Sequence, residues 1–220
     1  LDMAHGVVRT DKLFATDNRA GLVSVRYQPS STNTAIDNGC VVLLNGLETG
    51  SREVHKGVTP AANSNLNDIV LIASPEVMYD ERLRNLDDYY NEAGKIARGY
   101  RLKGGDMFGV TKDVLAGKDT PAVGDYVELK ADVKLNVVAS PTASTTLVGN
   151  IYAIENVGRY TYYVIKVLAD AVSVDVDVTT GVDTLAELTD VDLTVAATDG
   201  QVLKYDNTSG KWIAGDDATT

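Results

Sequence analysis

The side chains that most often carry chemistry in proteins are few in this chain and far apart along it. Its 220 residues include two histidines, His5 and His55, and one cysteine, Cys40. Cys40 lies in a short apolar run, where a thiol is expected to pack as a small hydrophobic group. His55 lies in a charged stretch with no second imidazole nearby. These residues argue against a zinc site, a thiol redox pair and an intrachain disulfide, so we predict no catalytic residue, no cofactor and no bound metal.

Asp175 and Asp177 alternate along the chain as the ligands of a calcium loop do. A calcium-binding helix–loop–helix motif also needs glycine at position 6 and glutamate at position 12. Counted from Asp175, position 6 is Thr180, and both Gly181 and Glu187 come one residue late. The pattern therefore fails, and it is more typical of a solvated strand face.

Motifs for phosphate binding and for hydrolysis are also missing. Residues 103–106, Lys-Gly-Gly-Asp, are too short for a phosphate loop and favour a turn. Asp87 and Asp88 are adjacent on a segment expected to be helical, whereas a glycosidase needs two carboxylates that face one cleft. No G-x-S-x-G sequence occurs. We predict that the protein is not an enzyme, and a carbohydrate-active enzyme or a lectin-like domain is the alternative from another class.

The charge of the chain excludes further classes. Its formal net charge is −11, so nucleic acid phosphates would repel it. No apolar run approaches the roughly 18 residues that indicate a membrane span, and residues 1–5 show no secretory signal. From Asp170 to the end there are 11 acidic and 2 basic residues, so the tail differs chemically from the nearly balanced body.

The secondary structure that positions these side chains is predicted to be mainly β-strands. Two continuous apolar runs, 40–44 and 68–72, indicate buried strands. Between residues 106 and 168 the chain alternates apolar and polar residues, which favours strands with one buried face. The clearest pair is 151–155 with 160–167, joined by a short hairpin loop; Tyr160, Tyr162 and Val164 should share one face, and Thr161, Tyr163 and Ile165 the other.

One helix is predicted near 75–93. Ser74 can cap it and Pro75 suits its first turn. Apolar residues then recur at helical spacing, which predicts a helix with one buried face. The side chains expected to be buried are those of Val77, Leu83, Leu86 and Tyr90, and those expected to be exposed are Glu81, Arg84 and Asp88.

These elements predict a mainly β protein with one α-helix. Residues 1–169 form a β-rich base domain, a small barrel or sandwich. Residues 170–184 form an acidic extended linker. Residues 185–220 form a small C-terminal module built on a β-hairpin, because its two apolar strands flank a turn that contains glycine.

The module carries a specific pattern. It contains Leu185-Ala-Glu-Leu-Thr-Asp-Val-Asp-Leu-Thr194, then Asp199-Gly-Gln-Val-Leu-Lys-Tyr-Asp206, and then Gly210-Lys-Trp-Ile213. This stretch of about 30 residues resembles a segment that is widespread in fibres and fibre-like head or tail appendages of tailed bacteriophages. Residues 1–169 are similar to the base regions of phage head-fibre or capsid-decoration proteins. The resemblance implies a three-fold axis, because phage fibres are commonly trimeric.

The residues independently favour oligomerisation, since a module this small has too few apolar side chains to fold alone. We expect an oligomer interface formed by Val202, Leu203, Tyr205, Trp212 and Ile213. The expected function is that of a head fibre or capsid-decoration protein, made in the bacterial cytoplasm and located on the capsid surface. Its expected partners are two further copies of itself, the major capsid protein and a glycan on the host surface, without nucleic acid or membrane.

Two alternatives remain open at this point. The protein can instead be a tail fibre or receptor-binding protein, which the same pattern would also serve. The hairpin can also pack against the β-rich base of its own chain rather than against other copies.

Overall fold

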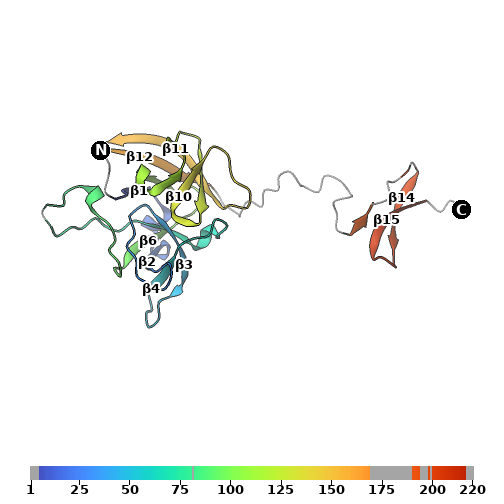
Figure 1. Cartoon of the computed structure of the whole chain (residues 1–220), viewed down its shortest axis with the longest axis horizontal. Coiled ribbons are helices and arrows are strands. Elements are labelled where there is room, and N and C mark those ends of the chain that lie inside the picture. The colour runs from blue at the N-terminus through green and yellow to red at the C-terminus, as the bar shows by residue number, and fades with distance from the viewer. Residues whose placement is uncertain (1–4, 81, 169–189, 194–197, 199, 217–220) are drawn as a thin grey trace. The chain divides into compact units, whose positions relative to one another are not determined.

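The structure is a computed structural model that describes residues 5–80, 82–168, 190–193, 198 and 200–216. The chain divides into two compact units, Leu1–Asp175 and Val176–Thr220 (Figure 1). The described residues form mainly strands, with one short α-helix, α1 (Phe14–Asp17). The predicted fold class, mainly β with one helix, is confirmed, although the helix lies elsewhere than expected. The predicted linker, 170–184, lies outside the described residues.

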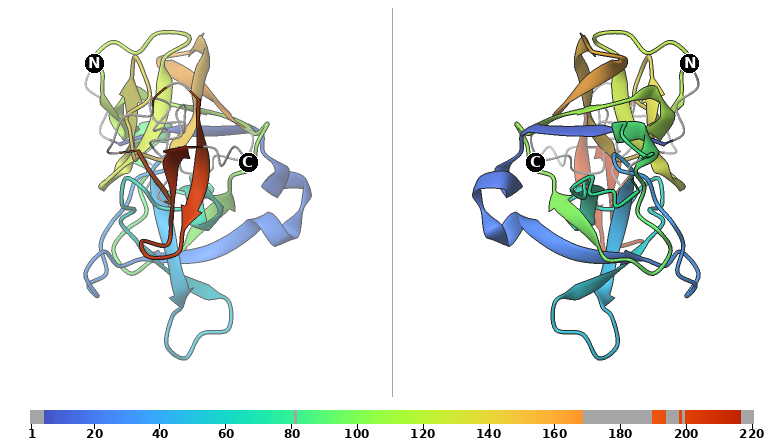
Figure 2. Two further views of the ribbon diagram at one scale, coloured as in Figure 1. Left: turned by 90° about the vertical axis from the view of Figure 1, so that its right-hand side faces the viewer. Right: turned by 90° about the vertical axis from the view of Figure 1, so that its left-hand side faces the viewer.

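Five strands of the first unit close into a barrel, in the order β2-β4-β3-β5-β6. Their bounds are β2 (Leu22–Tyr27), β3 (Val41–Leu47), β4 (Val54–Val58), β5 (Ile69–Ile72) and β6 (Ala97–Arg101). β2 and β4 run parallel, and every other pair is antiparallel. Both apolar runs predicted as buried strands are confirmed as β3 and β5. The β3–β4 hairpin projects from the barrel (Figure 2).

The barrel interior is filled by valines that approach two glycines closely. Val25, Val42 and Val70 are fully buried. A Cβ atom at Gly57 would lie 2.6 Å from Cγ1 of Val25, and one at Gly99 would lie 3.0 Å from Cγ2 of Val70. A side chain at either glycine would therefore compete with the valines for the same space.

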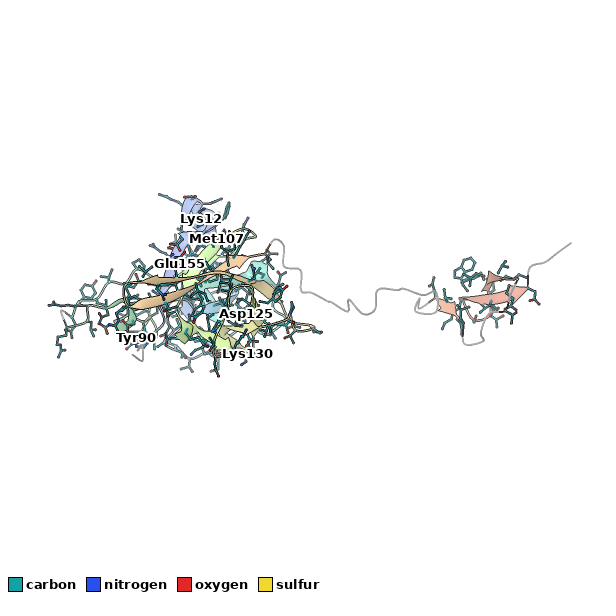
Figure 3. The ribbon with its side chains drawn as sticks, turned by 90° about the horizontal axis from the view of Figure 1, so that it is seen from above. Lys12, Tyr90, Met107, Asp125, Lys130 and Glu155 are labelled. Atoms are coloured by element: carbon teal, nitrogen blue, oxygen red, sulfur yellow. The ribbon has the colours of Figure 1, made fainter. Side chains whose placement is uncertain are left out.

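The remaining strands of the first unit form a seven-stranded sheet in the order β1-β7-β12-β11-β9-β10-β8. Their bounds are β1 (Val8–Lys12), β7 (Met107–Val110), β8 (Leu115–Gly117), β9 (Tyr126–Lys130), β10 (Asp132–Val138), β11 (Leu147–Val157) and β12 (Tyr160–Val167). Only the edge strand β8 runs parallel to its neighbour. Lys12 and Met107, which pair across β1 and β7, lie together in Figure 3.

The predicted hairpin is confirmed as the β11–β12 pair, which is antiparallel. Val157 pairs with Tyr160, so the turn consists of two residues, and its Gly158 has the positive φ of 61° that such turns favour. Along β12, Tyr160 and Tyr162 pack with Val7, whereas Ile165 belongs to the main core. The predicted alternation therefore separates a buried set, Tyr160, Tyr162 and Val164, from a mixed one. In the mixed set Ile165 is buried, Tyr163 is half-buried and Thr161 is exposed.

The barrel and the sheet share one hydrophobic core. A single cluster of buried side chains includes Val25 and Val70 of the barrel and Phe108 and Ile165 of the sheet. The first unit is thus one domain rather than two. In its described connections lie four 3₁₀ helices: η1 (Arg19–Gly21), η2 (Leu66–Asp68), η3 (Leu86–Asp88) and η4 (Lys112–Val114).

The helix predicted near 75–93 is wrong. The described residues of this segment form loops and turns, and only η3 is helical. Val77, Leu83, Leu86 and Tyr90, which were expected to be buried, are 38–60% exposed. Arg84 is exposed and Asp88 is half-buried, whereas Glu81 lies outside the described residues.

Local hydrogen bonds explain why a helical pattern does not become a helix here. Asp80 accepts a bond from the backbone N–H of Arg82, and one oxygen of Asp88 accepts bonds from the backbone N–H groups of Arg84 and Asn85. Aspartate side chains that bind nearby N–H groups compete with helical bonds and favour turns. The apolar spacing alone therefore does not determine the structure of this segment.

Candidate functional site

The second unit contains a three-stranded sheet in the order β13-β15-β14. Its strands are β13 (Val191–Asp192), β14 (Gln201–Asp206) and β15 (Lys211–Asp216). β14 and β15 form the antiparallel hairpin that the sequence predicts, and β13 lies parallel to β15. Among the described residues, β14 pairs on one side only and is an edge strand.

The hairpin turn is held by Asp206. Its carboxylate accepts hydrogen bonds from the hydroxyl and backbone N–H of Ser209 and from the backbone N–H of Thr208. These bonds lower the pKa of Asp206, the Ser209 hydroxyl contributing most. The chain then turns through Gly210, whose φ is +69°. The sequence Asp-Asn-Thr-Ser-Gly therefore fixes the register of the two apolar strands.

The register divides the five predicted interface residues between the two faces of this sheet. Tyr205 pairs with Trp212 and Leu203 pairs with Ala214, and residues that pair directly share a face. Leu203, Tyr205 and Trp212 therefore form one surface, which we call the aromatic face. Val202 and Ile213 lie on the opposite face.

The aromatic face is largely uncovered in the single chain. The rings of Tyr205 and Trp212 meet edge to face, with centroids 5.4 Å apart. Leu203, Tyr205 and Trp212 are 40–53% exposed, and Val191 is the one apolar residue in the described part of this unit that is buried. A sheet with so little buried area is not expected to be stable by itself.

The two histidines and the cysteine lie in the first unit, whereas Asp175 and Asp177 lie outside the described residues. Nδ1 of His5 is 2.9 Å from Oδ1 of Asp37, and its ring stacks on Tyr90 with centroids 4.5 Å apart. His55 is a half-buried residue of β4. Burial, with a smaller contribution from Asp37, raises the pKa of the Cys40 thiol to about 12, so this thiol stays protonated at neutral pH.

Two further observations concern metal ions and membranes. The part of the chain that the structure describes contains no group of three or more side chains placed to hold a metal ion. Within those same residues, none of the helices has the length and apolar character that crossing a bilayer requires.

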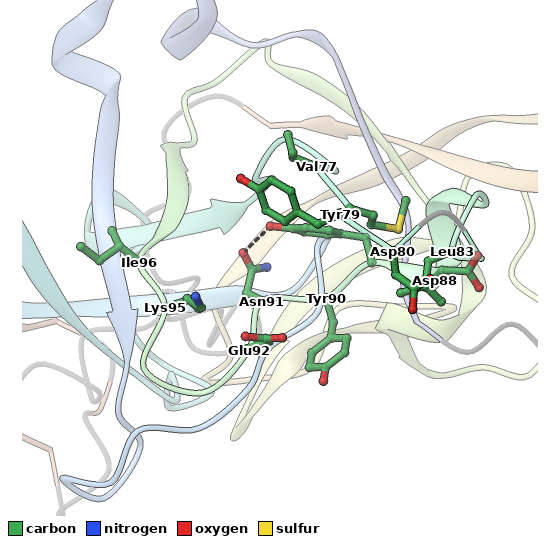
Figure 4. A pocket seen from close by; sticks show the side chains of 12 residues that line it. Val77, Tyr79, Asp80, Leu83, Asp88, Tyr90, Asn91, Glu92, Lys95 and Ile96 are labelled. Atoms are coloured by element: carbon green, nitrogen blue, oxygen red, sulfur yellow. Dashed lines mark hydrogen bonds between the residues drawn. The ribbon is translucent and has the colours of Figure 1, made fainter.

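Sequence reasoning missed a cavity in the first unit. It has a volume of about 470 Å³ and lies beside the segment that follows β5 (Figure 4). We call it the tyrosine pocket, and it is lined by Val77, Met78, Tyr79, Asp80, Leu83, Asp88, Tyr89, Tyr90, Asn91, Glu92, Lys95 and Ile96. A signal was present in the sequence, because tyrosine, aspartate and asparagine are concentrated between residues 79 and 91. A helical interpretation assigned the tyrosines to packing instead.

Buried amides hold both ends of the segment that forms this pocket. Asn38 donates to the carbonyl of Ser74 at 2.8 Å and accepts from the backbone N–H of Ser74 at 2.9 Å. Asn91 donates to Oδ1 of Asn38 and to the carbonyl of Ile36, both at 3.1 Å. Since Asn38 and Asn91 are 1% and 4% exposed, these bonds are shielded from water and fix the segment to the barrel.

Comparisons with known proteins return no match for this chain among family models, curated proteins or solved structures.

Proposed function

We propose that this chain is a structural virion protein of a tailed bacteriophage, a head fibre or capsid-decoration protein that assembles as a homotrimer. The observation that carries the proposal is the exposed aromatic face of the second unit. Its three large apolar side chains lie together, and the described residues of the same unit leave them half uncovered. Burying the exposed parts of Tyr205 and Trp212 would contribute on the order of 5 kcal/mol per chain.

The aromatic face suits the trimer axis better than the opposite face does. Leu203, Tyr205, Trp212 and Ala214 bring no charge to its centre, whereas Val202 and Ile213 share the opposite face with Lys204. The Lys204 stem lies over Gly215, since a Cβ atom there would be 3.1 Å from its Cδ. Charged groups are disfavoured in the buried core of an interface, so the lysine face turns outward.

The first unit then acts as the base that binds the major capsid protein. A trimer presents three identical bases, and binding by one raises the effective concentration of the other two at the capsid. Such avidity requires no new chemistry. It accounts for a fold in which a large β domain is joined to a small module with an unsatisfied apolar surface.

Light scattering on the full chain tests the assembly. We expect the mass of three chains at micromolar concentration, and the mass of one chain would contradict the proposal. Tyr205→Ala combined with Trp212→Ala should shift the mass to the monomer. Ile213→Ala on the opposite face is the matched control and should leave the trimer largely intact.

Electron microscopy tests the location. Particles of the phage that encodes the chain, labelled with an antibody against the first unit, should carry label over the capsid surface. Label confined to the tail would favour a tail fibre or receptor-binding protein, which the same module would also serve. Absence of label from the particle would contradict both structural roles.

A further inference from the structure

We propose that the tyrosine pocket binds a neutral carbohydrate. All the residues that line this pocket belong to the first unit, so binding there would require neither the trimer nor the capsid. A volume of about 470 Å³ falls in the range typical of sites for small molecules. Figure 4 shows Tyr79, Asn91 and Glu92 gathered on one side of the pocket, and Asp80, Leu83 and Asp88 on the other.

An exposed tyrosine ring is the first reason. Tyr79 is 95% exposed, so its ring faces water instead of packing in the core. The face of an aromatic ring carries partial negative charge and attracts the weakly positive C–H groups on one face of a pyranose. A tyrosine also loses little conformational entropy on binding, because it has only two rotatable side-chain bonds. Tyr79 is therefore suited to be the stacking platform.

Polar groups elsewhere in the lining are the second reason. The Glu92 carboxylate and the Lys95 ammonium form no hydrogen bond or ion pair with described residues, and both line the pocket. Carboxylates accept and ammonium groups donate hydrogen bonds, whereas a sugar hydroxyl does both. The lining therefore combines an exposed aromatic ring with a hydrogen-bond acceptor and a donor, the groups that a sugar ring can use.

Charge selects the class of sugar. Three carboxylates line the pocket, those of Asp80, Asp88 and Glu92, against the single ammonium of Lys95. Arg82, just outside the pocket, pairs with Asp80 at 2.7 Å and offsets that carboxylate, which leaves Asp88 and Glu92 against Lys95. Phosphates, sialic acids and other anions would meet net negative charge and be repelled. A neutral glycan is therefore favoured over an anionic one.

The pocket is also held in shape before any ligand arrives. Asn91, which lines it, is buried and fastened to Ile36 and Asn38. One oxygen of Asp88 accepts two backbone N–H groups, a bond arrangement that lowers its pKa and keeps it ionised. Asn91 and Asp88 are therefore already ordered, so binding carries no cost for ordering these two groups.

Saturation-transfer NMR on the full chain tests the proposal directly. The probes are four neutral disaccharides, lactose, maltose, cellobiose and chitobiose, each at millimolar concentration, with sialyllactose as the anionic probe. We expect transfer to at least one neutral disaccharide and weaker transfer to sialyllactose. Tyr79→Ala should weaken that affinity by at least about tenfold, and Tyr79→Phe, which keeps the ring, should retain it.

Tyr152→Ala provides the matched control. Tyr152 is also an exposed tyrosine, 56% accessible, but it lies on β11 and does not line the pocket. This variant should bind the disaccharide like the unmodified chain. Absence of transfer to all four neutral probes, or equal loss in both alanine variants, would overturn the proposal. Preference for sialyllactose over lactose would overturn the charge argument.

The same variants distinguish this proposal from the assembly role. Tyr79→Ala should retain the trimer mass and should still sediment with capsids. If it lost either property while glycan binding was absent throughout, the pocket would be a protein-docking surface and the carbohydrate proposal would be wrong. Loss of the trimer in the Tyr205 and Trp212 variant should leave glycan binding unchanged.

Discussion

Single polar residues fix the parts of this molecule that apolar patterning leaves undetermined. Asn38 is the clearest case, because its one amide bonds both backbone groups of Ser74 and the side chain of Asn91. A lone asparagine in sequence gives no sign of such partners, which lie 36 and 53 positions away. Sequence reasoning could therefore predict β5, which precedes the loop that this amide holds, but neither the loop nor β6, which follows it.

Asn38→Ala should lower the free energy of unfolding by about 1–3 kcal/mol, because the backbone groups of Ser74 lose their buried partner. Urea denaturation of the variant, monitored by far-UV circular dichroism, measures the change in the free energy of unfolding. Asn67→Ala is the control, since Asn67 is exposed and its replacement should change stability by less than about 0.5 kcal/mol. Equal effects of the two substitutions would contradict the role given to Asn38.

The hydrogen bonds of Asp125 lead us to expect that the free energy of unfolding falls in acid. Its carboxylate accepts bonds from Nζ of Lys118 at 2.9 Å and from the backbone N–H of Ala122 at 2.7 Å, and the Lys118 bond is the main cause of its lowered pKa. A carboxyl whose pKa is lower in the folded state than the unfolded value of about 3.9 stabilises the fold above that value. This contribution is lost as pH falls through the folded pKa.

Asp125→Asn should therefore destabilise the chain near neutral pH and should flatten its loss of stability below about pH 4. Urea denaturation at neutral pH and in acid measures both effects. Asp119→Asn, a change at an exposed carboxylate in the same loop, should leave the acid profile close to that of the unmodified chain. An unchanged profile in the Asp125 variant would contradict the assignment.

Among the secondary-structure elements of this chain, the alternation of apolar and polar residues predicts β12 correctly. The helical spacing of apolar residues predicts a helix that does not form. The alternation in residues 160–167 predicts β12 and its two faces, because a strand places successive side chains on opposite sides whatever its neighbours. The spacing of Val77, Leu83 and Leu86 predicts a helix, but aspartates between them bind backbone N–H groups locally. For the module, alternation places Tyr205 and Trp212 together, whereas a list of apolar residues without the register cannot separate the two faces.

Gly57→Ala tests how tightly the barrel is packed. The added Cβ would lie 2.6 Å from Val25, so strands or side chains must shift, and a loss of about 1–3 kcal/mol is expected. Gly109→Ala in β7 is the matched control, because its Cβ would make an ordinary contact of 3.4 Å with Cβ of Tyr162. Thermal unfolding should show a lower midpoint for the first variant only. Similar midpoints for the two variants would mean that the barrel interior can accommodate an added methyl group at Gly57.

At the scale of the whole molecule, deleting the C-terminal module tests the roles proposed for the two units. Each unit has its own sheet, and the large shared core belongs entirely to the first unit. Removing residues 185–220 should therefore leave a folded β domain with sharp unfolding, but it should abolish the trimer. Light scattering and calorimetry on the shortened chain check both expectations. If the trimer survives the deletion, the contacts that hold the chains together lie in the first unit.

Net charge should make the assembly depend on salt. Each chain carries a formal charge of −11, so three chains repel one another at low ionic strength. Salt reduces the screening length from about 30 Å at 0.01 M to about 8 Å at 0.15 M, and the trimer should tighten modestly over that range. Sedimentation equilibrium at the two salt concentrations measures this change. Weaker assembly at the higher concentration would indicate an interface dominated by ion pairs instead of the aromatic face.

Among the described residues β14 has one unpaired edge, and this edge has a consequence for solubility. An edge strand offers free N–H and C=O groups to any other strand, which is a common route to aggregation. Here the strand is six residues long, Lys204 lies at its middle and is exposed, and Asp206 ends it. Charged side chains on an edge oppose pairing with a second edge. Lys204→Val should therefore leave the fold intact but cause the protein to precipitate at concentrations where the unmodified chain stays clear. This lysine would then oppose fibrous aggregation through the edge of the second unit.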